Sequence, residues 1–247
     1  MGAVPLVAAA VCPHPPLIVP EVAQRAAPEL DALRAAADAA VVRLLAAEPD
    51  TVLVVGAAPR THRFAPDDAG DLRAYGVAVE AGLGAATRGG PRVLPLSLTI
   101  GAWLLARAGT GVPRFAQGVA ADAAPPECAR LGARLAAEFT AEPARRVALL
   151  VTGDGSACRG ERSPGHDDPR AEAYDRHVAA ALAAADTRAL LDLDPALSAA
   201  LRAAGRPPWQ VLAAAVEAAG GDWRGELSYD AAPYGVAYFV ANWEPRR

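Results

Sequence analysis

The sequence predicts one α/β domain over residues 1–247, with a central, mostly parallel sheet flanked by helices and a C-terminal antiparallel strand pair. Short, unbroken apolar runs predict strands buried on both faces, as in parallel sheets, at Leu6–Cys12, Thr51–Gly56 and Val147–Val151. Longer segments with apolar residues at helical spacing lie between these runs, and strands that alternate with helices are typical of βαβ units. The sequence shows no linker and no internal repeat that would divide the chain.

The first strand ends abruptly in the segment Cys12-Pro13-His14-Pro15-Pro16. Prolines lack the N–H that strand pairing needs, so they end the strand and stiffen the backbone around His14. Open α/β sheets bind ligands at the carboxyl ends of their strands. His14 is therefore either a ligand-binding residue or a simple strand cap in a proline-rich loop.

The second strand repeats this order of features. The segment Val22–Glu48 has the apolar spacing of a helix, Thr51–Gly56 is the next strand, and Pro59 and His62 follow it. A strand–helix–strand unit predicts neighbouring parallel strands joined by a right-handed crossover. We therefore expect His14 and His62 to emerge at the same, carboxyl edge of the sheet.

The remaining elements follow from apolar patterns and turn residues. The patterns predict further strands at Tyr75–Glu80, Arg92–Leu96 and Phe115–Ala121, and a terminal antiparallel pair at Trp223–Asp230 and Pro233–Trp243. Helices are predicted at Ser97–Ala108, Pro125–Phe139, Pro195–Ala204 and Pro207–Ala219, and after Asp168. Ser97 is the predicted N-cap of its helix, and Cys128 lies on the predicted core face of the next one.

The loop after Val147–Val151 is rich in small residues and contains Asp154, Ser156 and Cys158. Small residues let the backbone approach a ligand, so this loop is a candidate site, with an ordinary tight turn as the alternative. It lacks the glycine spacings of nucleotide-binding loops. The next loop places His166 beside two aspartates, where a histidine is either functional or merely solvated.

Composition limits the classes of function. Hydrophobic residues make up 53% of the chain and charged residues 21%, which is typical of a globular protein. The net charge of −4 and the lack of a basic stretch give no support for nucleic-acid binding. The sequence predicts no membrane span and no signal peptide. Three scattered cysteines without a CxxC pair predict free thiols and a cytoplasmic location. Abundant alanine, with arginine favoured over lysine, indicates a GC-rich bacterial genome.

Two histidines at strand ends make up two-thirds of a 2-His-1-carboxylate metal site. Such a site holds Fe(II) in non-haem oxygenases and leaves positions open for substrate and O₂. Imidazole also suits Zn(II), so the two histidines leave the choice between Fe(II) and Zn(II) open.

The motifs CPHPP, PRTHRF and TGDGSACR, the helix DDPRAEAYDRHV and a late Pro-Tyr-Gly-Val segment follow one another along the chain. This pattern resembles the class III extradiol ring-cleavage dioxygenases over nearly the whole chain. It is most similar to the branch of catalytic chains typified by protocatechuate 4,5-dioxygenase β chains, and distantly to the MEMO proteins. The resemblance implies Fe(II) bound by His14 and His62, a later glutamate as third ligand, a small aromatic substrate and a homo-oligomer.

The chain departs from the family pattern at two places. The family's acid–base histidine corresponds to Ala157, or to Cys158 if the register shifts by one residue. The region expected to supply the glutamate, residues 201–210, contains no acid. The substitutes considered for the third ligand are Asp154, Glu217 and Glu226, with Glu226 taken as the predicted ligand. The predicted catalytic residues are His166, Asp154 and Ser156.

These departures leave three hypotheses. Because a general acid–base group typically contributes about 10² to 10⁴ in rate, its loss can silence an enzyme without changing its fold. The first hypothesis is a dioxygenase whose site uses substitute residues. The second is a non-catalytic member of the family that binds a small molecule or partner, and the third is a metal-dependent hydrolase. O₂ uptake on catechols favours the first, binding without turnover the second, and zinc-dependent hydrolysis the third. We expect little or no cleavage of protocatechuate or simple catechols.

Overall fold

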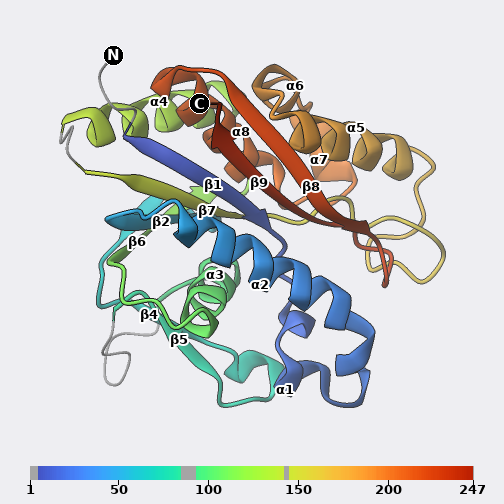
Figure 1. Ribbon diagram of the computed structural model, residues 1–247. Coiled ribbons are helices and arrows are strands. Elements are labelled where there is room, and N and C mark those ends of the chain that lie inside the picture. Colours follow the sequence, from blue (N-terminus) through green and yellow to red (C-terminus); the bar gives the residue numbers. More distant parts are fainter. Residues whose placement is uncertain (1–4, 85–92, 142–144, 247) are drawn as a thin grey trace.

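A computed structural model describes residues 5–84, 93–141 and 145–246 and contains a seven-stranded sheet with the order β3-β6-β2-β7-β1-β9-β8 (Figure 1). The strands are β1 (Leu6–Cys12), β2 (Thr51–Ala58), β3 (His62–Phe64), β6 (Arg114–Ala120), β7 (Val147–Thr152), β8 (Trp223–Ala231) and β9 (Tyr238–Pro245). The four central strands are parallel, whereas β3, β9 and β8 pair antiparallel to their neighbours. The α/β class, the mostly parallel sheet and the terminal antiparallel pair are confirmed.

Helices cover both faces of the sheet. They are α1 (Pro20–Ala23), α2 (Asp31–Ala46), α3 (Leu96–Arg107), α4 (Pro125–Ala141), α5 (Ala171–Ala184), α6 (Thr187–Leu191), α7 (Pro195–Ala200) and α8 (Arg206–Ala219). A second small sheet pairs β4 (Ala69–Asp71) with β5 (Glu80–Gly82). In the part of the chain that the structure describes, no helix is long and apolar enough to cross a membrane.

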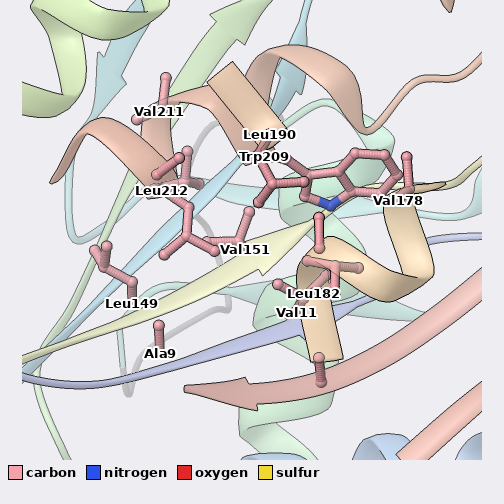
Figure 2. Close-up of a cluster of buried hydrophobic side chains, with 14 of the residues drawn as sticks. Ala9, Val11, Leu149, Val151, Val178, Leu182, Leu190, Trp209, Val211 and Leu212 are labelled. Atoms are coloured by element: carbon pink, nitrogen blue, oxygen red, sulfur yellow. The ribbon is translucent and has the colours of Figure 1, made fainter. Parts of the chain in front are cut away.

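The central strands bury side chains on both faces, which explains their unbroken apolar sequence. Successive side chains of a strand point to opposite faces. Ala9 and Val11 of β1 pack toward α5 and α8, as Figure 2 shows, whereas Ala8 and Ala10 belong to the core beneath α2 and α3. Every residue of β7 is buried, as its central position requires.

One topological expectation is wrong: β1 and β2 are not neighbours. β7 lies between them and pairs with both, so that Thr152 is level with Cys12 on one side and with Gly56 on the other. The crossover through α2 therefore skips one strand position. All three strands are apolar on both faces, so their sequence patterns do not distinguish the central strand from its neighbours.

Several local boundaries also differ from the sequence prediction. The helix expected at Val22–Glu48 is divided into α1, a 3-10 segment at Gln24–Leu30 and α2, because Pro28 cannot donate to a continuous helix. Ser97 is not an N-cap; its hydroxyl donates to the carbonyl of Ala57 at 2.5 Å, while Pro95 takes the cap position. Of the strand predicted at Tyr75–Glu80, only Glu80 belongs to a strand, β5. The strand predicted at Arg92–Leu96 is wrong for its described residues, since 93–95 form no strand and Leu96 begins α3; Arg92 lies outside the described residues. The short elements β3, β4 and α6 were not predicted.

Helices α4 and α8 pack closely against each other beside the core. Gly132 of α4 is buried against the backbone of α8, and a Cβ at this position would lie 2.4 Å from the carbonyl oxygen of Val211. Cys128, Leu131 and Leu135 line the buried face of α4, as their spacing predicts. The absence of a side chain at Gly132 therefore sets the distance between the two helices.

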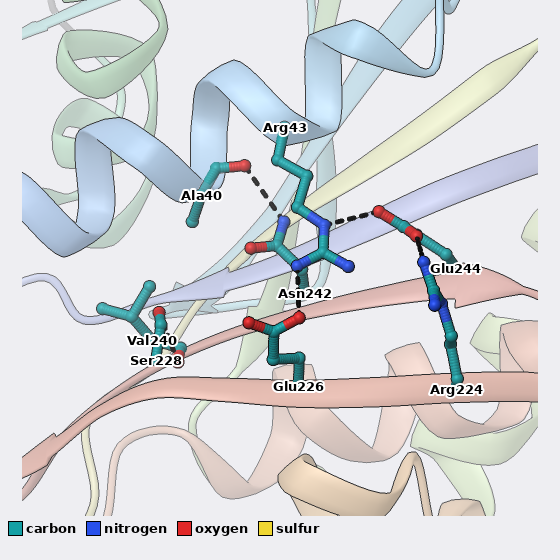
Figure 3. A network of polar contacts seen from close by, with 8 residues as sticks. All are labelled: Ala40, Arg43, Arg224, Glu226, Ser228, Val240, Asn242 and Glu244. Atoms are coloured by element: carbon teal, nitrogen blue, oxygen red, sulfur yellow. Dashed lines mark hydrogen bonds and ion pairs between the residues drawn. The ribbon is translucent and has the colours of Figure 1, made fainter.

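An ionic network ties α2 to the terminal strand pair (Figure 3). Arg43 of α2 donates from Nε to Glu244 at 2.5 Å and from Nη1 to Glu226 at 2.6 Å. Arg224 donates to the other oxygen of Glu244 at 2.7 Å. Beneath these charges, the amide of Asn242 donates to the carbonyl of Ala40 at 3.0 Å. The network anchors the outer strands β8 and β9 to a helix from the start of the chain.

Changing Glu244→Gln should lower the free energy of unfolding by about 1–2 kcal/mol at pH 7. Hydrogen bonds from Arg43 and Arg224 hold the pKa of Glu244 at about 2, below the usual 4.5, although partial burial acts in the opposite direction. Because the folded-state pKa is depressed, the stabilisation is complete above pH 4.5 and is lost as the pH falls through about 2. Urea denaturation of both proteins at pH 7, 4 and 2.5 measures this difference.

The exposed pair of Glu172 and Arg176 provides the control for this prediction. Glu172→Gln should change stability by less than about 0.5 kcal/mol at every pH, because exposed ion pairs on a helix contribute little. A stability difference between wild type and Glu244→Gln that persists undiminished at pH 2.5 would contradict the assignment.

Candidate ligand site at the carboxyl edge of the sheet

The candidate site begins where β1 and β7 end side by side. Cys12 and Thr152 are paired across the two strands, and the N–H of Gly153 donates to the carbonyl of Cys12 at 3.0 Å. His14 and Asp154 each follow two residues after this pair. Parallel pairing of two strands with matched ends therefore brings the imidazole and the carboxylate to the same point, as predicted.

His14 and Asp154 form a buried pair. The backbone N–H of His14 donates to Asp154 Oδ1 at 2.8 Å, and His14 Nδ1 lies 3.5 Å from the same oxygen. Only 8% of His14 is exposed, and only 15% of the Asp154 side chain. Nδ1 is buried and has no hydrogen-bond partner in the described part of the chain. A buried polar atom of this kind needs a partner from outside the chain, such as water or a ligand.

Tyr238 adds a phenol to this pair. It lies on β9, the neighbour of β1, and is buried. Burial raises the pKa of Tyr238, and the negative charge of Asp154 raises it further. Burial also raises the pKa of Asp154, while the charge and the backbone N–H of His14 lower it. The site therefore combines an imidazole, a carboxylate and a neutral phenol in a poorly hydrated place.

Glycines allow the loop after β7 to pack tightly against α8. A Cβ on Gly153 would lie 2.6 Å from the Cα of Gly205 and 2.9 Å from Trp209 Nε1. The N–H of Gly205 donates to the carbonyl of Asp154 at 2.8 Å. The small residues in this loop, predicted to admit a ligand, thus also serve to hold Asp154 against the interior.

Ser156, a predicted catalytic residue, faces the interior. Its N–H and its hydroxyl donate to the two carboxylate oxygens of Asp175 at 2.8 and 2.6 Å, and both residues are buried. Burial raises the pKa of Asp175, against the opposing effect of these hydrogen bonds and of Arg159. The structure therefore gives Ser156 a bracing contact within the loop that carries Asp154.

The three cysteines are free and buried, in agreement with the sequence prediction. The thiol of Cys158 lies 3.3 Å from the carbonyl of Gly165 and 3.5 Å from that of Leu201. Burial raises the pKa of Cys12 to about 12 and also raises that of Cys158. Because the thiolate is the reactive form, neither position is suited to a nucleophile.

His62 does not join His14. It lies on β3, level with Gly118 of β6, and β6, β2 and β7 separate it from β1. Four strand spacings of about 4.8 Å place its row about 19 Å from Cys12. Its exposed ring contacts Phe64 edge-on, with 5.0 Å between the ring centroids. Both histidines follow carboxyl strand ends, as predicted, but the short strand β3 carries His62 to the far side of the sheet.

Glu226 and His166 also lie away from the pair. Glu226 projects from β8 toward α2, where Arg43 binds it, and its side chain is 63% exposed. The prediction that Glu226 completes a metal site with His14 and His62 therefore does not hold in the structure. His166 is exposed in the loop before α5, with a left-handed backbone conformation (φ 64°).

The positions of His14, His62 and Glu226 decide whether the metal that the family resemblance implies fits this structure. A facial triad needs two histidines and a carboxylate on one ion. His14 and Asp154 converge, but the described residues contain no group of three or more His, Cys, Asp or Glu placed to share a metal. The predicted ligands His14, His62 and Glu226 do not fit one shared Fe(II) or Zn(II) ion, because His62 lies on the distant strand β3 and Glu226 is bound by Arg43.

Two residues of interest were not predicted from the sequence. Tyr238 is one aromatic among several in a terminal strand, and Arg206 has the appearance of a surface residue before two prolines. Tyr238 reaches the site because its strand, β9, pairs with β1, the strand that precedes His14. For Arg206 no local signal exists, since its burial comes from tertiary packing alone.

Comparisons with known proteins support the fold. No family model matches the chain, and no curated protein matches it. A solved structure, described as the uncharacterized protein JW3007 from Escherichia coli K12, matches with a TM-score of 0.56 and 16% sequence identity. The match covers 96% of this chain and 99% of that chain. At this identity the likeness concerns the fold alone.

Proposed function

We propose that this chain is a class III extradiol dioxygenase-like protein that binds a small phenolic or catecholic molecule at the His14–Asp154 pair without cleaving it. The observation that carries the proposal is the buried Nδ1 of His14, which lies 3.5 Å from Asp154 and has no hydrogen-bond partner in the described chain. The family resemblance of the motifs around both residues supports the choice of ligand class.

The chemistry of the pair suits a ligand with hydroxyl groups. Carboxyl oxygens accept hydrogen bonds, so Asp154 offers acceptors to phenolic O–H groups. His14 offers a ring nitrogen that either donates or accepts, depending on its tautomer. Tyr238 presents a buried aromatic ring beside them. Hydrogen bonds formed in such a poorly hydrated place are stronger than those in water.

Binding without ring cleavage is supported by the groups that the site lacks. Ala157 stands where the family has its proton-transfer histidine, and its N–H donates to the carbonyl of Leu201 at 2.8 Å. His62 lies on β3, and Glu226 is bound by Arg43. The described residues therefore provide neither the complete ligand set nor the acid–base group that the family chemistry would use.

Isothermal titration with catechol tests this proposal. The wild type should bind catechol, and His14→Gln and Asp154→Asn should each weaken binding at least about tenfold, the effect of losing one hydrogen bond to a buried polar group. His62→Gln is the matched control and should bind as the wild type does. Circular dichroism checks that each variant keeps the fold.

Oxygen uptake with Fe(II) and catechol under air separates binding from turnover. The proposal expects no catechol-dependent uptake by the wild type. Absence of catechol binding would overturn the proposed ligand class. Robust O₂ uptake that is lost in both His14→Gln and His62→Gln would overturn the non-catalytic assignment and show that the two histidines act together.

A further inference from the structure

Arg206 is a buried charge without a counter-charge. It is the first residue of α8 and is only 3% exposed, yet no carboxylate lies within ion-pair distance of it in the described chain. The other buried arginine, Arg34, is paired with Asp31 at 2.5 Å. Removing an unpaired charge from water is costly, so a position such as that of Arg206 calls for an explanation.

The protein partners of Arg206 are all neutral. Nη1 donates to Gln210 Oε1 at 2.9 Å, and Nη2 lies 3.5 Å from the carbonyl oxygen of Ala121. The amide of Gln210 is itself committed, since it donates to the carbonyls of Leu191 and Leu193. These contacts position the guanidinium, but they do not neutralise it.

Two titratable groups that act on Arg206, Cys128 and Tyr174, do not supply a negative charge either. Burial raises the pKa of the Cys128 thiol and outweighs the lowering effect of Arg206. Burial likewise raises the pKa of Tyr174 to about 12, although Arg206 acts to lower it. Both groups are therefore neutral near pH 7, and the positive charge remains uncompensated.

Arg206 lines a cavity between the carboxyl end of β6 and the α7–α8 segment. The cavity has a volume of about 420 Å³ and is also lined by Ala121, Asp122, Ser198 and Arg202, and by Pro195 and three alanines. The carboxylate of Asp122 is exposed and forms no ion pair with Arg206 in the described chain. Because Nη2 contacts the carbonyl of Ala121, the guanidinium lies at the wall that this residue forms. Pockets of 300–1,000 Å³ typically hold small organic ligands.

We propose that this cavity binds the carboxylate of a small organic acid, with Arg206 as the counter-charge and the alanine and proline wall against the apolar part of the ligand. A guanidinium pairs with a carboxylate through two parallel hydrogen bonds. A carboxylate fits better than a phosphate because few donors are free: Arg202, the second guanidinium at the wall, already donates from Nη1 to the carbonyl of Pro164 at 3.1 Å. Pro207 and Pro208 have no N–H, and Ser198 already donates to the carbonyl of Asp194 at 2.7 Å.

The organic-acid cavity is separate from the His14–Asp154 pair. None of its lining residues belongs to that pair, although Gly205, next to Arg206, donates its N–H to the carbonyl of Asp154. The inference therefore does not depend on the proposed function.

Isothermal titration with sodium benzoate and with benzamide, at constant ionic strength, tests the inference. Benzamide has a similar shape but no charge. Benzoate should bind the wild type at least about tenfold more tightly than benzamide does, since a charge-assisted pair is stronger than a neutral hydrogen bond. Arg206→Gln should remove this preference. Arg188→Gln, at an exposed position on α6, is the matched control and should keep it.

A second variant covers the case in which Arg206→Gln fails to fold. Ala199 is exposed and lines the same cavity, so Ala199→Phe fills the cavity from the solvent side without touching the interior. It should abolish benzoate binding and leave the melting temperature unchanged. Equal affinity for benzoate and benzamide, or benzoate binding that survives Ala199→Phe, would overturn the inference. Inorganic phosphate that binds more tightly than benzoate through Arg206 would overturn the ligand class.

Discussion

Changing Gly132→Ala should lower the free energy of unfolding by about 3 kcal/mol, at the upper end of the usual cost of overpacking. The added Cβ would lie 2.4 Å from the carbonyl oxygen of Val211, 2.6 Å from the Cβ of Ala214 and 2.8 Å from the N of Ala215. These atoms belong to the α8 backbone or are attached directly to it, so no side-chain rotation relieves the clash. The helices must move apart, which loosens the core between them.

Whether Gly132→Ala lowers or raises the free energy of unfolding shows whether helix packing or helix propensity dominates at this position. At an exposed helical position, Gly→Ala stabilises a protein by about 1 kcal/mol. Ala133→Val, at the neighbouring exposed position, should cost about 0.5 kcal/mol from propensity alone. Urea denaturation followed by tryptophan fluorescence measures both variants. A Gly132→Ala protein at least as stable as the wild type would show that the helices do not approach as closely as described.

Changing Asp175→Ala should cost about 2–5 kcal/mol, because each buried donor left without an acceptor costs about 1–3 kcal/mol. The change leaves the N–H and the hydroxyl of Ser156 without acceptors in the interior. Because Asp154 lies two residues before Ser156, the loop should also loosen and weaken binding of catechol. Denaturation and titration together measure the two effects.

Asp186→Ala is the matched control for this prediction. Asp186 caps α6 by accepting from the N–H of Ala189 at 3.0 Å and is exposed. Loss of such a cap costs about 1 kcal/mol and should leave catechol binding unchanged. Ser156→Ala should cost less than Asp175→Ala, because the backbone N–H at position 156 still donates to Asp175 Oδ1 and only Oδ2 loses its donor. If Asp175→Ala costs no more than Asp186→Ala, Ser156 and Asp175 do not brace the loop.

The sheet could be predicted because each central strand is an unbroken apolar run, and because the intervening helices have clear periodicity. The order of the strands could not be predicted, because β1, β2 and β7 are equally apolar and each is suited to the middle of the sheet. Only the pairing of Thr152 with both Cys12 and Gly56 reveals which strand is central.

The candidate site was predictable to the extent that local sequence positions it. His14 and Asp154 directly follow strand ends, so parallel pairing alone brings them together. His62 departs because three residues, two of them exposed, form the antiparallel strand β3, and so short a polar segment carries no strand signal. The burial of Arg206 depends on Gln210, Ala121 and the surrounding helices, which no local pattern encodes.

The position of β7 between β1 and β2 constrains how the chain can fold. The first strand has β7 and β9 as its neighbours, and both come from the region after residue 146. During synthesis, β1 therefore leaves the ribosome long before either of its partners exists. Contacts between such distant segments slow folding, because a long loop must close before they form. Until then β1 is unpaired on both edges, and β2 is unpaired on the edge that β7 later occupies, a condition that favours aggregation and chaperone binding.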